Sequence, residues 1–209
     1  MSPLISFAQD VFLQHHPLSL AGCHMGRTIT VIRLLSGKLV IHSTADFSSE
    51  DLVAIRELGE PGWLLEATNF HDTLAPQGRT AFPDTVYLVP PGFRSAEALK
   101  AQPLLPNAAP DNWQDELTLI EIGGMPKIRE HALYHCPSKT LVIADLMFNL
   151  PATANWWTRA FLRMTAGTKG YPSMSRLFRF YIKDHEAFTE SLRRLAELDR
   201  VGERRAARR

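Results

Sequence analysis

Short apolar runs rich in β-branched residues recur along the first part of the chain, and turn-forming residues separate them. Residues 28–35 (TITVIRLL) and 39–44 (LVIHST) flank a Ser-Gly-Lys turn, which predicts a hairpin. Two further runs, residues 63–68 (WLLEAT) and 85–89 (TVYLV), predict buried strands that end at polar or proline-rich turns. The pattern therefore indicates a sheet formed before residue 90.

A second group of strands is predicted between residues 117 and 150. Its apolar runs are Leu117–Ile122, His131–Cys136 and Thr140–Leu146, and a Pro-Ser-Lys turn joins the last two as a hairpin. Residues 103–115, rich in Pro, Asn, Ala and Asp, separate the two groups and are expected to form a surface loop.

Capping residues and three- to four-residue spacing predict the helices. Ser48 or Ser49 caps the first, which ends at Gly59, and Ser95 caps a second over residues 95–102. After Asn149 the apolar spacing becomes helical and predicts helices at Ala154–Met164, Ser175–Ile182 and Ala187–Leu198.

These elements predict one α/β domain over residues 27–199. An N-terminal arm, residues 1–26, precedes it and can add an edge strand, and a basic tail, residues 200–209, follows it. The length of 209 residues suits a single core.

Charge and cysteine content restrict the classes of partner and the compartment. The formal charge of +1 argues against a dedicated nucleic-acid or membrane surface, and the N-terminus lacks the basic and apolar regions of a signal peptide. The two cysteines, Cys23 and Cys136, have no metal or redox spacing. A reducing, cytoplasmic setting is expected.

Asp145 is the first residue whose position requires a chemical explanation. It ends the apolar run LVIAD, and a carboxylate there is costly unless a metal, a cation or hydrogen bonds hold it. The alternative is that Asp145 caps a helix or bonds a loop.

Three more residues follow strand ends and are candidates for metal binding or proton transfer. His71 and Asp72 come directly after the strand at 63–68, and His42 lies near the end of another apolar strand. The competing interpretation is a strand-capping His71 and a core His42 with one satisfied hydrogen bond. His131 and His135 share one strand face, but that face is expected to be solvated.

Several familiar motifs are absent from the sequence. It contains no GxGxxG, P-loop, GxSxG or HExxH, so nucleotide binding and serine-elbow hydrolysis have no support. The terminal arginines, including Arg208 and Arg209, are expected to form a solvated tail, and nucleic-acid binding through them is a distant third possibility.

Three blocks in order, GRTITVIRLLSGKLVIHST, ATNFHDTLAPQGRTAFPDTVYLVPPG and EHALYHCPSKTLVIADLMFNL, resemble the uncharacterised DUF4336 family over about residues 26–200. That family is similar to a divergent branch of the metallo-β-lactamase-like fold. The resemblance implies an αββα sandwich with metal at one edge, held by loops that follow strands.

The resemblance also implies which residues would hold the metal. The HxHxDH block of typical members falls at residues 69–74, where only His71 is kept and Asp72 is a shifted carboxylate. Asp145 matches the bridging carboxylate, Pro126 stands where a second His is expected, and His42 replaces an early-strand Asp. The implied ligand set is His42, His71, Asp145 and Asp72, around one divalent zinc or iron.

Two functions follow from this incomplete set of ligands. The first is a hydrolase of the metallo-β-lactamase-like type with a reduced metal site, in which His71 and Asp145 act on a small-molecule substrate. The second is a non-catalytic binding or interaction module that keeps the fold but has lost the metal chemistry. The sequence leaves both open.

Overall fold

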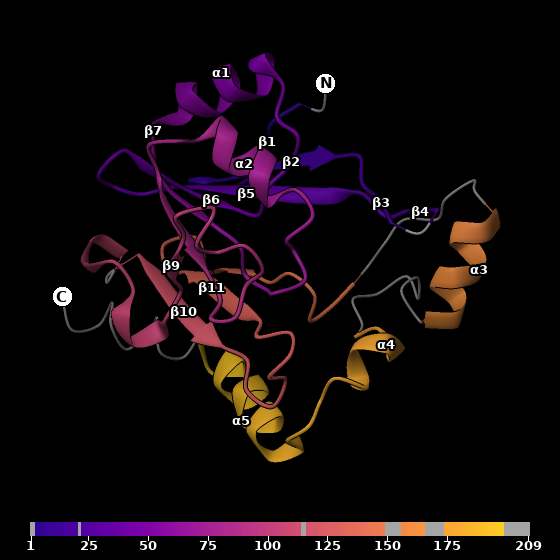
Figure 1. Cartoon of the computed structure of the whole chain (residues 1–209). Coiled ribbons are helices and arrows are strands. Elements are labelled where there is room, and N and C mark those ends of the chain that lie inside the picture. The colour runs from indigo at the N-terminus through magenta and orange to yellow at the C-terminus, as the bar shows by residue number, and fades with distance from the viewer. Residues whose placement is uncertain (1–2, 21, 114–115, 149–155, 166–173, 199–209) are drawn as a thin grey trace.

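The structure is a computed structural model that describes residues 3–20, 22–113, 116–148, 156–165 and 174–198. Its larger sheet has seven strands (Figure 1). Their spatial order is β1 (Ile5–Ala8), β2 (Val11–His16), β5 (Arg27–Arg33), β6 (Lys38–His42), β7 (Glu60–Leu65), β8 (Val86–Val89) and β9 (Gln102–Pro103).

The direction of pairing changes at β6. Strands β1, β2, β5 and β6 are antiparallel neighbours, whereas β6 to β9 run parallel. The predicted hairpin of residues 28–44 is confirmed as β5–β6, in which Thr30 pairs with His42. The N-terminal residues supply two strands of this sheet, β1 and β2, where the sequence suggested one edge strand.

The described residues form a second, smaller sheet, a short two-stranded pair and several helices. A second sheet contains β10 (Leu117–Glu121), β11 (His131–His135) and β12 (Thr140–Val142), and β3 (Ser19–Leu20) pairs with β4 (Cys23–His24). The helices are α1 (Ser49–Leu58), α2 (Ala75–Ala81), α3 (Trp156–Thr165), α4 (Arg176–Arg179) and α5 (His185–Ala196), with 3-10 turns η1 (Pro106–Ala108) and η2 (Asp111–Trp113).

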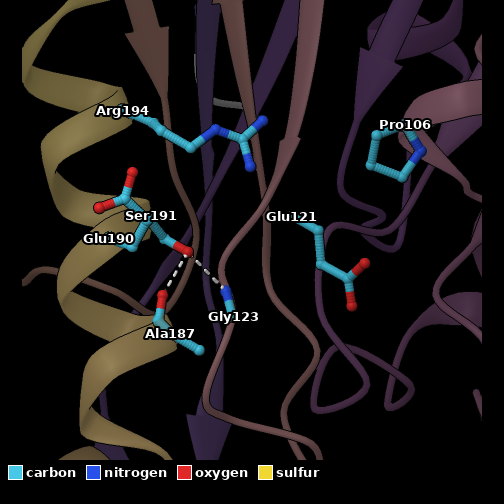
Figure 2. Close-up of a pocket in the computed structure, with 7 residues that line it drawn as sticks. All are labelled: Pro106, Glu121, Gly123, Ala187, Glu190, Ser191 and Arg194. Carbon is cyan, nitrogen blue, oxygen red and sulfur yellow. Dashed lines mark hydrogen bonds between the residues drawn. The ribbon is translucent and has the colours of Figure 1, made fainter.

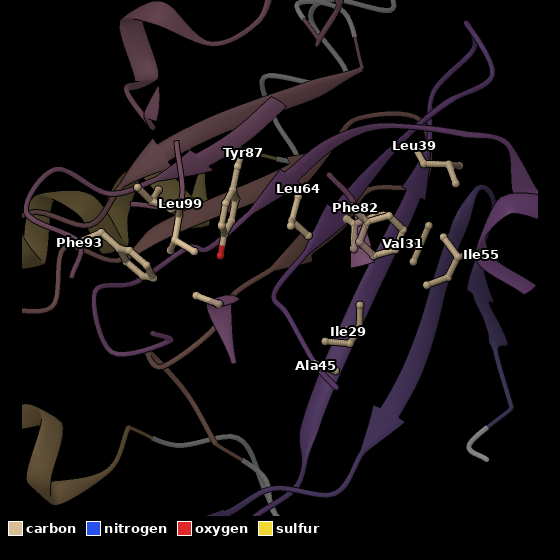
Figure 3. Packing of buried hydrophobic residues seen from close by; sticks show 13 residues of the cluster. Ile29, Val31, Leu39, Ala45, Ile55, Leu64, Phe82, Tyr87, Phe93 and Leu99 are labelled. Carbon is tan, nitrogen blue, oxygen red and sulfur yellow. The ribbon is translucent and has the colours of Figure 1, made fainter. Parts of the chain in front are cut away.

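Helices α1 and α2 cover one face of the large sheet (Figure 1). Alternate residues of β5 and β6 point to this side, and Figure 3 shows them packed against Ile55 of α1 and against Phe82. Ser48 caps α1 in a reciprocal capping box with Asp51, so the predicted start and the end at Gly59 are confirmed.

The opposite face of the large sheet packs against the small sheet. Val40, Leu65 and Leu88 from the first meet Leu119 and Leu133 from the second in one buried cluster. The far side of the small sheet is covered by α5 and α4 through a third cluster, which includes Ile122 and Phe188. The layers are therefore helix, sheet, sheet and helix, and the predicted αββα sandwich is confirmed.

Two local predictions were wrong. Residues 95–100 form turns, not the start of a helix, because Ser95 and Lys100 have φ values of 60° and 51°, which an α-helix cannot contain. The chain instead bends to bury Leu99 and then enters β9, which takes in the last residue of the expected helix and the first of the expected surface loop. Helix α2 was missed because its sequence, APQGRTA, has no side-chain N-cap and contains both Pro76 and Gly78.

Gly78 fixes how closely α2 approaches the strand end at Thr44. A Cβ on Gly78 would lie 2.2 Å from Thr44 Cγ2 and 2.6 Å from its Cβ, too close without a shift of α2. We expect Gly78→Ala to destabilise the fold by about 1–3 kcal/mol, measured by urea unfolding. Gly62→Ala is the control, since its nearest contacts are at 3.4 Å, and an equal loss in both variants would contradict this account.

Candidate functional site

The ends of three strands meet at one edge of the sandwich. The residues after β6 and β7 lie at the same edge because these strands are parallel, and they bring Ser43, Thr44 and Glu66 together. The loop after β7 adds His71, and the segment after β12 adds Asp145. The sequence placed His71 and Asp145 at strand ends, and the structure brings the two side chains together.

Glu66 lies at the centre of this cluster and is fully buried. Its Oε1 accepts hydrogen bonds from the hydroxyls of Thr44 and, at 3.5 Å, Tyr87. Ser43 Oγ donates to Oε2 at 3.5 Å. Burial, with the neighbouring Glu66 charge, raises the pKa of Tyr87 well above its usual range, so that phenol stays a proton donor.

His71 is held between two carboxylates. Its Nδ1 lies 3.6 Å from Glu66 Oε2, and its Nε2 lies 3.4 Å from Asp145 Oδ1. Burial opposes charging of the imidazole, but the attraction and hydrogen bonding of Asp145 and Glu66 outweigh it and raise the pKa of His71 to about 9. With only these neighbours, His71 is an imidazolium at neutral pH.

Ser43 reaches this cluster through an unusual backbone conformation. Its φ is 75°, in the left-handed region that a non-glycine residue seldom adopts. There its hydroxyl lies 3.3 Å from His71 Nδ1 and accepts a hydrogen bond of 3.3 Å from Arg27 Nη1. The strained backbone therefore serves to place one hydroxyl among three charged groups.

Glu130 supports Asp145 from behind. Its carboxylate accepts hydrogen bonds from the backbone N–H groups of Ala144, at 3.0 Å, and Asp145, at 3.2 Å. Because these two N–H groups bond to Glu130 and not to a neighbouring strand, β12 ends at Val142 and not at the predicted Leu146. Burial and the nearby Asp145 charge raise the pKa of Glu130 to about 8.

His42 is buried at the end of β6 and lies two residues after Val40, which faces the small sheet. Burial, with the charges of His71 and Arg27, lowers its pKa to about 3, so the ring is neutral. Neither ring nitrogen has a hydrogen-bond partner among the described residues, and the same holds for Asp145 Oδ2. The core-histidine interpretation with one satisfied bond therefore does not describe His42.

Asp72 points elsewhere. Its Oδ2 lies 2.9 Å from Arg94 Nε, so it forms an ion pair away from His71. Within the described ranges, no three His, Cys, Asp or Glu side chains gather as ligands of one metal ion. Of the four implied ligands, the structure brings His71 and Asp145 into contact.

The other histidine prediction was wrong. His131 and His135 are buried rather than solvated, because β11 is the middle strand of the small sheet. Their Nδ1 atoms are paired with Arg129 O at 3.1 Å and Ser138 Oγ at 2.7 Å. The arginine-rich tail, residues 200–209, lies outside the described residues.

The sequence did not identify most of the residues that surround His71 and Asp145. Glu66 ends the apolar run WLLEAT just as Asp145 ends LVIAD, so the same signal could have identified it. Glu130, which was not among the predicted site residues, is fully buried. Arg27 and Ser43 carry no local signal, since only the folded chain brings them to this edge.

A separate cavity of about 380 Å³ lies between α5 and the end of β10 (Figure 2). Ser191 lines this cavity, and its hydroxyl accepts a hydrogen bond of 2.9 Å from Gly123 N and donates one of 2.9 Å to Ala187 O. It shares no residue with the His71 cluster. We place the candidate site at the cluster because the perturbed groups lie there.

Among the described residues, no helix is long and apolar enough to cross a membrane. No protein-family model and no curated protein matches the sequence.

Solved structures do match. DIM-1 metallo-β-lactamase exposed to ceftazidime is 16% identical, with a TM-score of 0.61 over 94% of this chain and 85% of that one. A metallo-β-lactamase from Pontibacter korlensis is 12% identical, with a TM-score of 0.55 over 86% and 96%. The mono-zinc form of FIM-1 from Pseudomonas aeruginosa is 13% identical, with a TM-score of 0.54 over 91% and 96%. The chain therefore has the fold of the metallo-β-lactamases.

Proposed function

We propose that this protein is a hydrolase of the metallo-β-lactamase-like type with a reduced site, in which His71 and Asp145 hold one divalent cation, zinc or iron. The observation that carries the proposal is the 3.4 Å separation of His71 Nε2 and Asp145 Oδ1. Two ligands of one tetrahedral zinc, each at about 2.0–2.2 Å, lie about 3.3–3.5 Å apart.

The surroundings of this pair support the same assignment. Metal-binding histidines commonly donate their second N–H to a carboxylate, and Glu66 stands at 3.6 Å from His71 Nδ1 in that role. Asp145 Oδ2 and both nitrogens of His42 are buried without a partner among the described residues. These atoms are therefore available as further metal ligands beside His71 and Asp145. We infer His42 as the next ligand to test.

The chain's own residues have definite roles in this proposal. A bound divalent cation would supply Lewis acidity and lower the pKa of a water molecule. Glu66 orients the His71 ring, and Glu130 fixes the Asp145 backbone through two amides.

Metal content tests the proposal directly. We expect protein purified without chelator to hold close to one zinc or iron, and added metal to raise the melting temperature. His71→Ala should lose both the metal and hydrolysis of model esters or phosphodiesters. His15→Ala, at an exposed histidine, is the matched control. Sub-stoichiometric metal with no thermal response would refute the proposal.

A second candidate function, a non-catalytic binding module, has one observation in its favour. His71, with a pKa raised to about 9, can place its positive charge between Glu66 and Asp145 without any metal. In that case His71→Ala destabilises the fold while metal content stays negligible in both proteins. The metal measurement therefore separates the two candidates.

Family and setting are also proposals. We propose membership of the DUF4336 family on the strength of the three sequence blocks described above, and with it a small-molecule substrate and a cytoplasmic location. Cys23 and Cys136 are free thiols, which agrees with a reducing compartment.

A further inference from the structure

Helix α3 presents its apolar stripe outward. One contact of the helix with the rest of the protein is the buried Thr158, whose Oγ1 accepts a hydrogen bond of 3.1 Å from His24 N on β4. The neighbouring Trp157, which is half-exposed, lies beside Gly22. Trp156 and Met164 lie on the other side of the helix and are 71% and 66% exposed. A helix normally buries such a stripe, so this orientation requires a partner surface.

The apolar surface continues onto α4. Arg176 Nη1 donates to Met164 O at 3.5 Å, which joins α4 to the end of α3, and the two helices lie on one side of the molecule (Figure 1). Phe180 is 76% exposed and Leu177 44%. We call Trp156, Trp157, Met164, Leu177 and Phe180, all exposed, the aromatic face.

The segment that carries the aromatic face has an excess of positive charge. Residues 146–183 contain no Asp or Glu, and their basic residues are Arg159, Arg163, Lys169, Arg176, Arg179 and Lys183. Of these, the ones on α3 and α4 and Lys183 are exposed. The whole chain has a charge of only +1, so its average hides this local excess.

We propose that the aromatic face docks on the surface of an anionic lipid bilayer. Tryptophan, phenylalanine and methionine enter the boundary between headgroups and acyl chains, while adjacent arginines pair with anionic headgroups. A second copy of this chain is a poorer occupant, because a two-fold contact through this face would bring the same cations together. The inference does not depend on the proposed hydrolase function.

Part of α4 also links this face to the interior. Phe178 packs against Phe70 and Phe148, with ring centroids 6.0 Å and 5.4 Å away. Phe70 adjoins His71 in the chain, so α4 is anchored beside the candidate site. Helix α4 is therefore held by half-buried ring contacts that the surface variants leave intact.

Co-sedimentation with vesicles tests the proposal. We expect the full chain to bind vesicles of phosphatidylcholine mixed with phosphatidylserine but not vesicles of phosphatidylcholine alone. High salt should release the bound protein. The double variants Trp156→Ser/Phe180→Ser and Arg159→Glu/Arg163→Glu should each bind at least about tenfold more weakly.

The matched control is Leu35→Ser/Arg56→Glu, which changes one exposed apolar and one exposed basic residue at other sites on the surface. It should bind as the unmodified chain does. Absence of binding to anionic vesicles would overturn the proposal, and so would equal binding by all variants. A dimer in sedimentation velocity that is lost in the Trp156 variant, without lipid binding, would assign the face to a second copy instead.

Discussion

Glu66→Ala is expected to lower the free energy of unfolding by about 3–5 kcal/mol, the usual loss when one partner of a buried charged pair is removed. Glu66 is fully buried and accepts hydrogen bonds from Thr44, Ser43 and Tyr87. Alanine leaves these hydroxyls without their acceptor and the His71 imidazolium without one of its two carboxylates. The melting temperature should fall by about 10 °C or more.

Two further variants make that result interpretable. Glu66→Gln keeps the shape and one acceptor oxygen but removes the charge, so it should lose less, about 1–3 kcal/mol. Glu60→Ala changes the same residue type at the exposed start of the same strand and should stay within about 0.5 kcal/mol of the unmodified protein. If Glu66→Ala unfolds no more easily than Glu60→Ala, the buried charge network is not what stabilises this edge.

The elements that sequence predicted well are those determined by local chemistry. The β5–β6 hairpin follows from two β-branched runs around one glycine turn, and α1 follows from a capping serine and a terminal glycine. His71 and Asp145 were also identifiable, since each stands where an apolar strand ends. In each case neighbours in the sequence determine the structure.

The features that sequence could not give depend on contacts between distant segments. Helix α2 forms although it lacks a cap, because Ala75 and the adjacent Phe82 are buried against the large sheet. Ser95 looks like a helix cap, but burial of Leu99 bends the chain into turns. Likewise, Arg27 and Ser43 become part of the site only when two strand ends meet. Tertiary packing overrides local preference at these positions.

The pH dependence of stability follows from the same cluster. Folding raises the pKa of His71 from an ordinary 6.5 to about 9, so the folded state binds a proton that the unfolded chain releases. This stabilisation is complete below pH 6.5 and is lost as the pH rises through 9. The shift corresponds to about 3 kcal/mol. Glu130, whose pKa rises from 4.5 to about 8, adds a fall of the same sign between those two pH values.

His42 has the opposite effect on the pH dependence of stability, and it does so at lower pH. Its pKa falls from 6.5 to about 3 in the folded state, so stability increases with pH across that interval and partly offsets Glu130. Above pH 6.5 nothing in this cluster opposes the decline caused by His71 and Glu130. The free energy of unfolding should therefore reach a plateau between about pH 4.5 and 6.5, where the effects of His42 and Glu130 offset each other, and then fall toward pH 9.

Urea unfolding between pH 6 and pH 9, with chelator present so that only protons exchange, measures this decline. His71→Gln keeps a polar side chain but cannot charge, so its alkaline slope should shrink to the part that Glu130 contributes. His15→Gln, at an exposed histidine, should keep the full slope. A flat profile above pH 6.5, or an unchanged slope in His71→Gln, would mean that His71 does not carry its proton between Glu66 and Asp145.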